Sequence, residues 1–81
     1  MAKDNESGLV VGIKQTLRLA EQDRLSTLFI AEDADQYVIK PALELAAQNS
    51  VPVVRVESKK KLGKMCGIEI GAAVAGAIKS I

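Results

Sequence analysis

The chain has 81 residues and a formal net charge of +1, and 48% of its residues are apolar although only Phe29 and Tyr37 are aromatic. This length allows one small domain, whose core must consist mainly of Ala, Val, Leu and Ile. Because His is absent and Cys66 is the single cysteine, the composition excludes an intramolecular disulfide and a metal site built from His and Cys ligands. Residues 1–7 are polar, and no apolar run approaches the roughly 18 residues of a membrane span. We therefore expect a cytoplasmic protein without a secretory signal.

The first half of the chain alternates between strand and helix patterns. Its small, charged residues at 1–7 predict a frayed end. Ile13, Leu17 and Ala20 lie within about 60° of arc at helical spacing, and they form a stripe that would face a core. Together the patterns predict a strand at 9–11 that stops at Gly12, a helix at 13–22 and a buried strand at 27–31.

The second half continues the alternation. The acidic residues at 32–35 predict a turn that could cap the following helix. Pro41 fits the first position of a helix that runs to about Gln48, with Leu43, Leu45 and Ala46 available to the core. Beyond it the patterns predict a strand at 51–56, a short basic helix at 59–65 that is broken by Gly63 and ended by Cys66 and Gly67, and a strand at 72–78. This order indicates an α/β fold, a three-layer α/β/α sandwich around a mixed sheet of about four strands.

Residues for catalysis are scarce. General acid–base catalysis at neutral pH usually uses His, which is absent. Glu32, Asp33 and Asp35 follow a predicted strand, where an α/β fold can hold Mg²⁺, but helix capping and solubility are the simpler interpretation. Cys66 has no His to act as a base, so we interpret it as a structural thiol. The glycines at 67 and 71 do not match a nucleotide-binding pattern. We expect no catalytic residue, no metal site, no cofactor and no small-molecule substrate.

The charges are unevenly distributed along the chain. Residues 21–44 include six acids and two bases. Residues 55–64 include one acid, Glu57, and five bases, which are Arg55, Lys59, Lys60, Lys61 and Lys64. Such a cluster suits an anionic partner, although on composition alone a solvated loop is an equally good interpretation.

The start of the first predicted helix is a second candidate anion site. The strand ends at Gly12, so the backbone N–H groups of the next turn should point outward at the positive helix terminus. Lys14, Gln15 and Arg18 flank this position and could donate to phosphates or to base edges. A Lys-Gln pair alone is ordinarily a solvated face, but here two basic surfaces could meet one backbone. With only two aromatic residues, structured RNA suits the chain better than a splayed single strand.

Four segments, in order and spacing, resemble the L7Ae ribosomal protein family and, within it, the short bacterial kink-turn-binding homologues. The segments are residues 12–16, residues 30–35, residues 49–53, and residues 57–63 with 66–68. The resemblance covers the chain from about Leu9 to Ile78. It implies a three-layer α/β/α fold and one domain over residues 1–81. It also implies binding to kink-turn RNA, a helix–bulge–helix element with tandem sheared G·A pairs.

The resemblance also implies a set of RNA-binding residues. The family motif Gly-x-Lys-Gln-Thr corresponds to Gly12, Lys14, Gln15 and Thr16, and Arg18 takes the position of a basic residue. Lys14-Gln15 resembles the bacterial pattern, whereas archaeal and eukaryotic relatives have Asn-Glu there, and Ile13 stands where the family commonly has Thr. The variable loop corresponds to Val56, Glu57, Ser58 and Lys59, which would pack against the flipped bulge nucleotide, and the phosphate contacts correspond to Lys60, Lys61 and Lys64.

The function that the resemblance implies is recognition and stabilisation of kink-turns by a cytoplasmic, ribosome-associated monomer. The RNA could be ribosomal or of the riboswitch type, and the sequence does not distinguish them. Two alternatives remain. One is a protein–protein adaptor of ribonucleoprotein assembly without direct RNA readout. The other is a small enzyme or nucleotide-binding regulator that uses Glu32, Asp33 and Asp35 with a metal ion.

Overall fold

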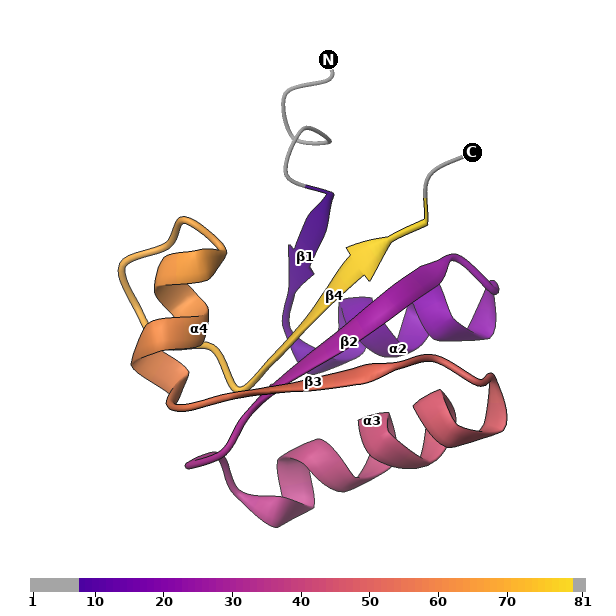
Figure 1. Ribbon diagram of the computed structural model, residues 1–81, viewed down its shortest axis with the longest axis horizontal. Coiled ribbons are helices and arrows are strands. Elements are labelled where there is room, and N and C mark those ends of the chain that lie inside the picture. The colour runs from indigo at the N-terminus through magenta and orange to yellow at the C-terminus, as the bar shows by residue number, and fades with distance from the viewer. Residues whose placement is uncertain (1–7, 80–81) are drawn as a thin grey trace.

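The computed structural model describes residues 8–79, so the frayed end expected at 1–7 lies outside the described residues. Four strands and three helices alternate along this part of the chain (Figure 1). The strands are β1 (Leu9–Val11), β2 (Leu25–Ala31), β3 (Val53–Val56) and β4 (Val74–Ile78), and the helices are α2 (Ile13–Glu21), α3 (Gln36–Gln48) and α4 (Lys59–Met65). The type of every element agrees with the sequence prediction.

The strands form one mixed sheet in the order β1-β4-β2-β3. Strands β2 and β3 are parallel, and β4 runs antiparallel to both of its neighbours, β1 and β2. Consequently β1, β2 and β3 point the same way, and their carboxyl ends reach the edge of the sheet where β4 begins. Loops and helix starts that follow these ends are brought together there.

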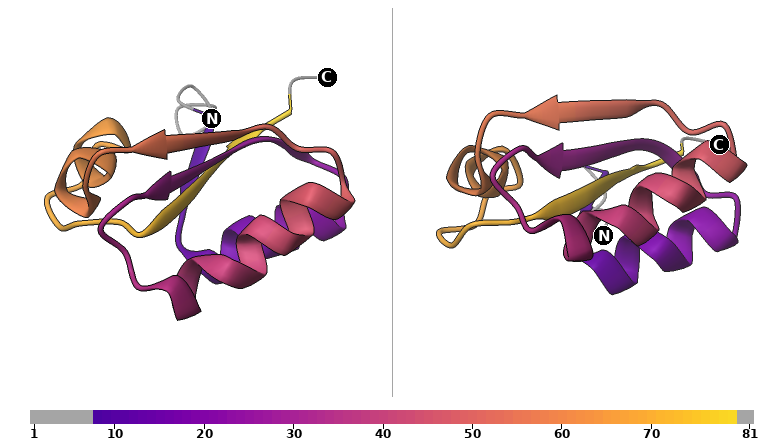
Figure 2. Two further views of the ribbon diagram at one scale, coloured as in Figure 1. Left: turned by 60° about the horizontal axis from the view of Figure 1, so that its bottom comes forward. Right: turned by 90° about the horizontal axis from the view of Figure 1, so that it is seen from below.

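Two helices cover one face of the sheet, and the third lies at one end of it. Figure 2 shows α2 and α3 side by side beneath the strands, with α4 next to the ends of β2 and β3. The buried apolar residues form one cluster, whose largest fully buried members are Leu28, Ile30, Ile39, Leu62 and Val74. This arrangement confirms the predicted α/β class with a four-stranded mixed sheet, in which α2 and α3 cover one face and α4 lies at the end of the sheet.

Helix α2 packs closely on the sheet through small residues. Ala20 is buried, and Ile13 and Leu17 pack against the core, as the predicted stripe requires. Thr16 is also buried, at 1% exposure, although the stripe did not include it. A side chain at Gly76 of β4 would lie 3.0 Å from Cγ2 of Thr16, so the glycine allows the helix to approach the strand.

The prediction that a helix begins at Pro41 is wrong, because α3 begins at Gln36 and contains this proline. Proline has no N–H to donate to the carbonyl group four residues earlier, that of Tyr37. Tyr37 is 88% exposed, so water can hydrate this turn. Burial of Ile39, Ala42 and Ala46 on the opposite side of the helix stabilises α3 across the missing bond, since most helical stability in proteins comes from packing.

The bounds of α4 agree with the prediction, but Gly63 does not break the helix. Gly63 is buried inside it, and a side chain there would meet the carbonyl oxygen of Ile70. The absent side chain thus lets the loop between α4 and β4 cross close to the helix. The helix ends at Met65, and Cys66 is its C-cap. The next residue, Gly67, has a φ of +79°, the left-handed conformation that glycine adopts readily after a helix.

Candidate nucleic-acid interface

Helix α4 presents a basic surface to solvent. The side chains of Lys59, Lys60, Lys61 and Lys64 are exposed, while Leu62 on the opposite side is fully buried. An open pocket of about 280 Å³ is lined by Ser58, Lys60, Lys61 and Lys64. The buried leucine therefore orients the helix so that its ammonium groups point outward, around a hollow that could receive an anionic group.

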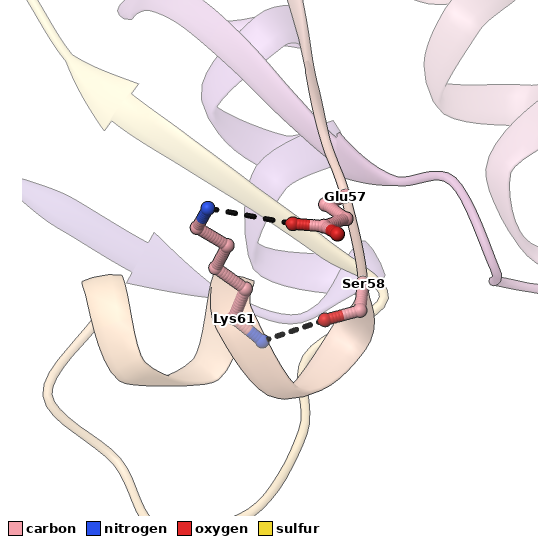
Figure 3. A network of polar contacts seen from close by, with 3 residues as sticks. All are labelled: Glu57, Ser58 and Lys61. Atoms are coloured by element: carbon pink, nitrogen blue, oxygen red, sulfur yellow. Dashed lines mark hydrogen bonds and ion pairs between the residues drawn. The ribbon is translucent and has the colours of Figure 1, made fainter.

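Two side chains cap the first turn of α4. Ser58 has an extended backbone, and its hydroxyl oxygen accepts from the backbone N–H of Lys61 at 3.1 Å (Figure 3). Oδ1 of Asp33, in the turn after β2, accepts from the backbone N–H of Lys59 at 2.8 Å. Such bonds satisfy N–H groups that have no partner within the helix. Ser58 is a local N-cap three residues before its donor, whereas Asp33 lies 26 residues before Lys59, so helical spacing alone cannot place it.

Glu57 partly neutralises the positive charge of this surface. Its Oε1 lies 3.5 Å from Nζ of Lys61, and both side chains are mostly exposed (Figure 3). An ion pair in solvent contributes only about 0.2–1 kcal/mol. Lys61 can therefore exchange Glu57 for a phosphate at small cost, whereas the ammonium groups of Lys60 and Lys64 have no partner among the described residues.

The start of α2 is the second part of the candidate interface. Lys14, Gln15 and Arg18 are exposed, and no side chain of the described residues caps the first turn of α2. Gly12 precedes the helix with a φ of +110°, and a side chain on it would lie 2.8 Å from Oε1 of Gln15. Because Gly12 has no side chain, the amide of Gln15 can lie over its Cα.

The backbone of Gly12 itself is hydrogen-bonded to the sheet. The N–H of Gly12 donates to the carbonyl oxygen of Val74 at 3.0 Å and so points into the sheet. It is therefore not available to an outside anion. The first helical hydrogen bond runs from the N–H of Thr16 to the carbonyl oxygen of Gly12 at 3.2 Å. The anion site predicted at the N–H groups of residues 13–15 therefore stays a prediction, and the exposed side chains of Lys14, Gln15 and Arg18 flank it.

Two predicted contact residues are buried. Thr16 is 1% exposed, and its hydroxyl donates to the carbonyl oxygen of Gly12 at 2.7 Å. Val56 is 6% exposed and belongs to the core cluster. Neither side chain is presented to solvent, because the packing of α2 and of β3 uses them. In this packing, the RNA contacts predicted for these two residues would have to use their backbone.

The structure brings the two parts of the interface to the same edge of the sheet. Val11 ends β1 immediately before α2, and Val56 ends β3 just before α4. Backbone hydrogen bonds connect them through the start of β4, from Ala72 to Lys59 at 3.0 Å and from Gly12 to Val74 at 3.0 Å. The carboxyl ends of parallel strands are the usual place for ligand sites in α/β sheets. One anionic partner could meet both α2 and α4 there.

The loop between α4 and β4 contributes a feature that the sequence analysis missed. Ile70 is 74% exposed on this loop, and its carbonyl oxygen lies against Gly63 of α4. An apolar side chain this exposed beside lysines could cover an apolar surface of a ligand. The exposure could not be foreseen, because the segment Gly67-Ile68-Glu69-Ile70-Gly71 has no regular period.

Cys66 and the acidic turn do not form a reactive site in the described structure. Burial raises the pKa of the Cys66 thiol above its ordinary value, which keeps it protonated and poorly nucleophilic at neutral pH. No group of three or more Cys, Asp or Glu side chains in residues 8–79 is arranged to hold a metal ion. Asp33 instead binds the backbone of α4. None of the three described helices is long and apolar enough to cross a membrane.

Comparison with known proteins gives the class to which this fold and surface belong. The model of the ribosomal protein L7Ae/L30e/S12e/Gadd45 family matches residues 1–80. The chain therefore belongs to this family, and the resemblance seen in its motifs is confirmed.

Bacterial relatives match most of the chain. A protein of Geobacillus sp. strain WCH70, named an RNA-binding protein, is 44% identical over 70 residues, which cover 86% of this chain and 85% of the relative. An RNA-binding protein of Halalkalibacterium halodurans is 45% identical over 65 residues, 80% of this chain and 79% of the relative. One from Staphylococcus aureus strain JH9 is 37% identical and covers 98% of this chain and 94% of its own.

Solved structures share the fold. The 15.5kD RNA binding protein of Giardia lamblia superposes with a TM-score of 0.86 at 23% identity, and the match covers 95% of this chain but 65% of the Giardia chain. A protein of unknown function from Bacillus halodurans has a TM-score of 0.84 at 19% identity, with 95% of this chain and 77% of the other covered. At these identities the likeness concerns the fold alone.

Proposed function

We propose that this protein binds structured RNA, and that it recognises and stabilises kink-turns without catalysing a reaction. The observation that carries the proposal is the presence of two cationic surfaces, on α2 and α4, at one edge of the sheet. Bacterial relatives at 44% and 45% identity are named RNA-binding proteins, and the family motif of Lys14 and Gln15 is exposed on the first of these surfaces.

The physical basis is the geometry of a bent RNA. A kink brings the phosphates of two helical arms close together, so cations at the inner angle are more favourable there than along a straight duplex. The lysines of α4 would neutralise phosphates, and Gln15 would meet the sheared G·A pairs, since its amide both donates and accepts. Phosphate contacts would position the protein on the RNA, and the base-edge contacts would specify the site.

Stabilisation follows from preferential binding to the bent form. A free kink-turn exchanges between extended and bent conformations, and a protein that binds only the bent one shifts the population by its differential affinity. Moving the ratio from 1:99 to 99:1 requires about 10⁴-fold preference for the bent form. The protein need not change its own fold, because the interface residues lie on helices and hydrogen-bonded loops.

The test compares two RNAs at one salt concentration. One is a kink-turn labelled with a donor and an acceptor dye at the ends of its arms, and the other is a duplex of the same length without the G·A pairs. We expect tighter binding to the kink-turn and an increase in energy transfer as the protein is added. Equal affinity for both RNAs, or binding without a change in energy transfer, would contradict kink-turn recognition.

We further propose that the protein acts as a monomer in the cytoplasm, associated with ribosomal or regulatory RNA. The competing adaptor function makes a different prediction, since its complexes should survive ribonuclease. Purifying the tagged protein from cells with and without ribonuclease, and sequencing RNA cross-linked to it, separates the two. Partners that remain after ribonuclease, with no cross-linked RNA, would support the adaptor.

A further inference from the structure

The backbone of Lys59 joins three segments that are distant in sequence. Its N–H donates to Oδ1 of Asp33, 26 residues earlier, at 2.8 Å. Its carbonyl oxygen accepts from the N–H of Ala72, on the loop that leads into β4, at 3.0 Å. The turn after β2, the first residue of the basic helix and the loop after that helix therefore meet at one residue.

Regular structure holds Asp33 in place for this contact. The preceding residue, Glu32, donates its N–H to the carbonyl oxygen of Val56 at 2.8 Å, which extends the pairing of β2 with β3 by one bond. The carboxylate thus projects from a turn that is fixed by the sheet. Helix α4, by contrast, has seven residues, and a helix of this length has little stability of its own. Its orientation depends on burial of Leu62 and on its caps.

We propose that Asp33 is a positioning residue for RNA binding, whose carboxylate holds the first turn of α4 so that its lysines face the phosphates of one bent RNA. This inference rests on the proposed function. In the proposed role, Asp33 does not contact the RNA itself but acts through its hydrogen bond to the backbone of Lys59. Ser58 caps the same turn at Lys61, and the two acceptors together fix the turn at its first and third residues.

Electrostatic repulsion and positioning by Asp33 predict changes in RNA affinity of opposite direction, so a variant without this carboxylate distinguishes them. An anionic side chain next to a phosphate-binding surface repels RNA, so removing its charge should tighten binding. Positioning requires that Asp33→Ala weaken binding, because the capping bond is lost. Glu32→Ala is the matched control, since Glu32 is an adjacent, exposed acid whose side chain makes no hydrogen bond to another described residue.

The experiment measures kink-turn affinity of the parent and four variants, at a temperature where circular dichroism shows each to be folded. We expect Asp33→Ala to bind about fivefold more weakly, the effect of losing an ordinary helix cap. Asp33→Asn keeps an oxygen acceptor and should stay within about twofold of the parent. Asp33→Glu keeps the charge but moves the oxygens by one methylene group, so it should bind more weakly than Asn. Glu32→Ala should match the parent or bind slightly more tightly.

A second readout separates positioning from a general loss of stability. If a lysine of α4 loses its phosphate, the slope of log affinity against log salt should become shallower by about one unit in Asp33→Ala. Loss of stability alone leaves the slope unchanged. Binding by Asp33→Ala as tight as the parent, or an unchanged slope with weaker binding, would overturn the inference. If Asp33→Ala does not fold, the Asn and Glu variants decide, and a Glu variant equal to Asn would overturn it.

The two proposals fail in different ways. The proposed function fails if the parent itself does not prefer a kink-turn to the duplex control. The role of Asp33 fails if the parent shows that preference and the Asp33 variants keep it at full affinity and with the same salt dependence.

Discussion

Replacing Gln15 with Ala should separate base recognition from phosphate binding. Gln15 is exposed on the first turn of α2, and its amide makes no hydrogen bond with another described residue. Ala forms helices at least as well as Gln, so the free energy of unfolding should change by less than about 0.7 kcal/mol. The core residues of α2 are untouched. Any large effect on binding must then come from the side chain itself.

The size of the effect follows from the contacts that are lost. One amide can donate and accept at a base edge, and such a contact contributes about 1–3 kcal/mol of discrimination. Affinity for a kink-turn should therefore fall by about 5- to 150-fold. Affinity for a duplex without G·A pairs should hardly change, because the remaining binding comes from phosphates.

The assay is a pair of titrations, parent and Gln15→Ala, against both RNAs at one salt concentration. Gln48→Ala is the matched control, since Gln48 is an exposed glutamine at the last residue of α3 and lies at the other edge of the sheet. Equal losses on the two RNAs would mean that Gln15 is a general backbone contact. No loss on either would refute the assignment of this helix face to base recognition.

Three further predictions concern α4 and its loop. Lys60→Ala should weaken binding to every kink-turn by a similar factor and lower the salt slope by about one unit, so binding independent of salt would argue against phosphate contacts. Lys61→Ala should weaken binding slightly less, because Lys61 must first give up its ion pair with Glu57; equal effects would mean that Glu57 does not weaken the contact of Lys61. Gly63→Ala should lower the free energy of unfolding, measured in urea, by about 1–3 kcal/mol, because its new side chain would meet the backbone of Ile70. Unchanged stability would mean that the loop between α4 and β4 can move away from the helix without cost. Cys66→Ala should keep RNA affinity within about twofold. In the parent, the thiol should react slowly with iodoacetamide at pH 7 and faster as the pH rises toward its raised pKa. Fast alkylation at pH 7, or a tenfold loss of affinity in the variant, would contradict a structural role.

Local sequence patterns were sufficient for the order and type of the elements. The apolar run of β2, the stripe on α2 and the basic segment of α4 each depend on residues close together along the chain, and the type of all three elements agrees with the prediction. The bounds of α4 also agree, whereas β2 begins at Leu25, two residues before its predicted start, and α2 ends at Glu21, one residue before its predicted end. The start of α3 was not, because Pro41 suits a first helical turn by its own geometry. Only the packing of Ile39 and Ala42 against the core shows that the helix continues back to Gln36.

The candidate site likewise has features that the sequence predicts and features that only tertiary packing decides. Composition and motif identify the residue types at the interface, since lysines in one segment and Lys14-Gln15 after a glycine are visible in the chain itself. Which of them reach solvent depends on the sheet. Thr16 and Val56 carry motif positions but are buried, because α2 lies close on Gly76 and Val56 packs in the core cluster.

The bond between Asp33 and Lys59 depends wholly on tertiary structure. By itself the sequence determined an α/β chain with a basic segment and the family to which it belongs. An acid in one turn and a lysine 26 residues later carry no periodic relation that could link them. They meet because β2 and β3 are parallel neighbours that end at the same edge, so the turn after one strand lies beside the helix that follows the other.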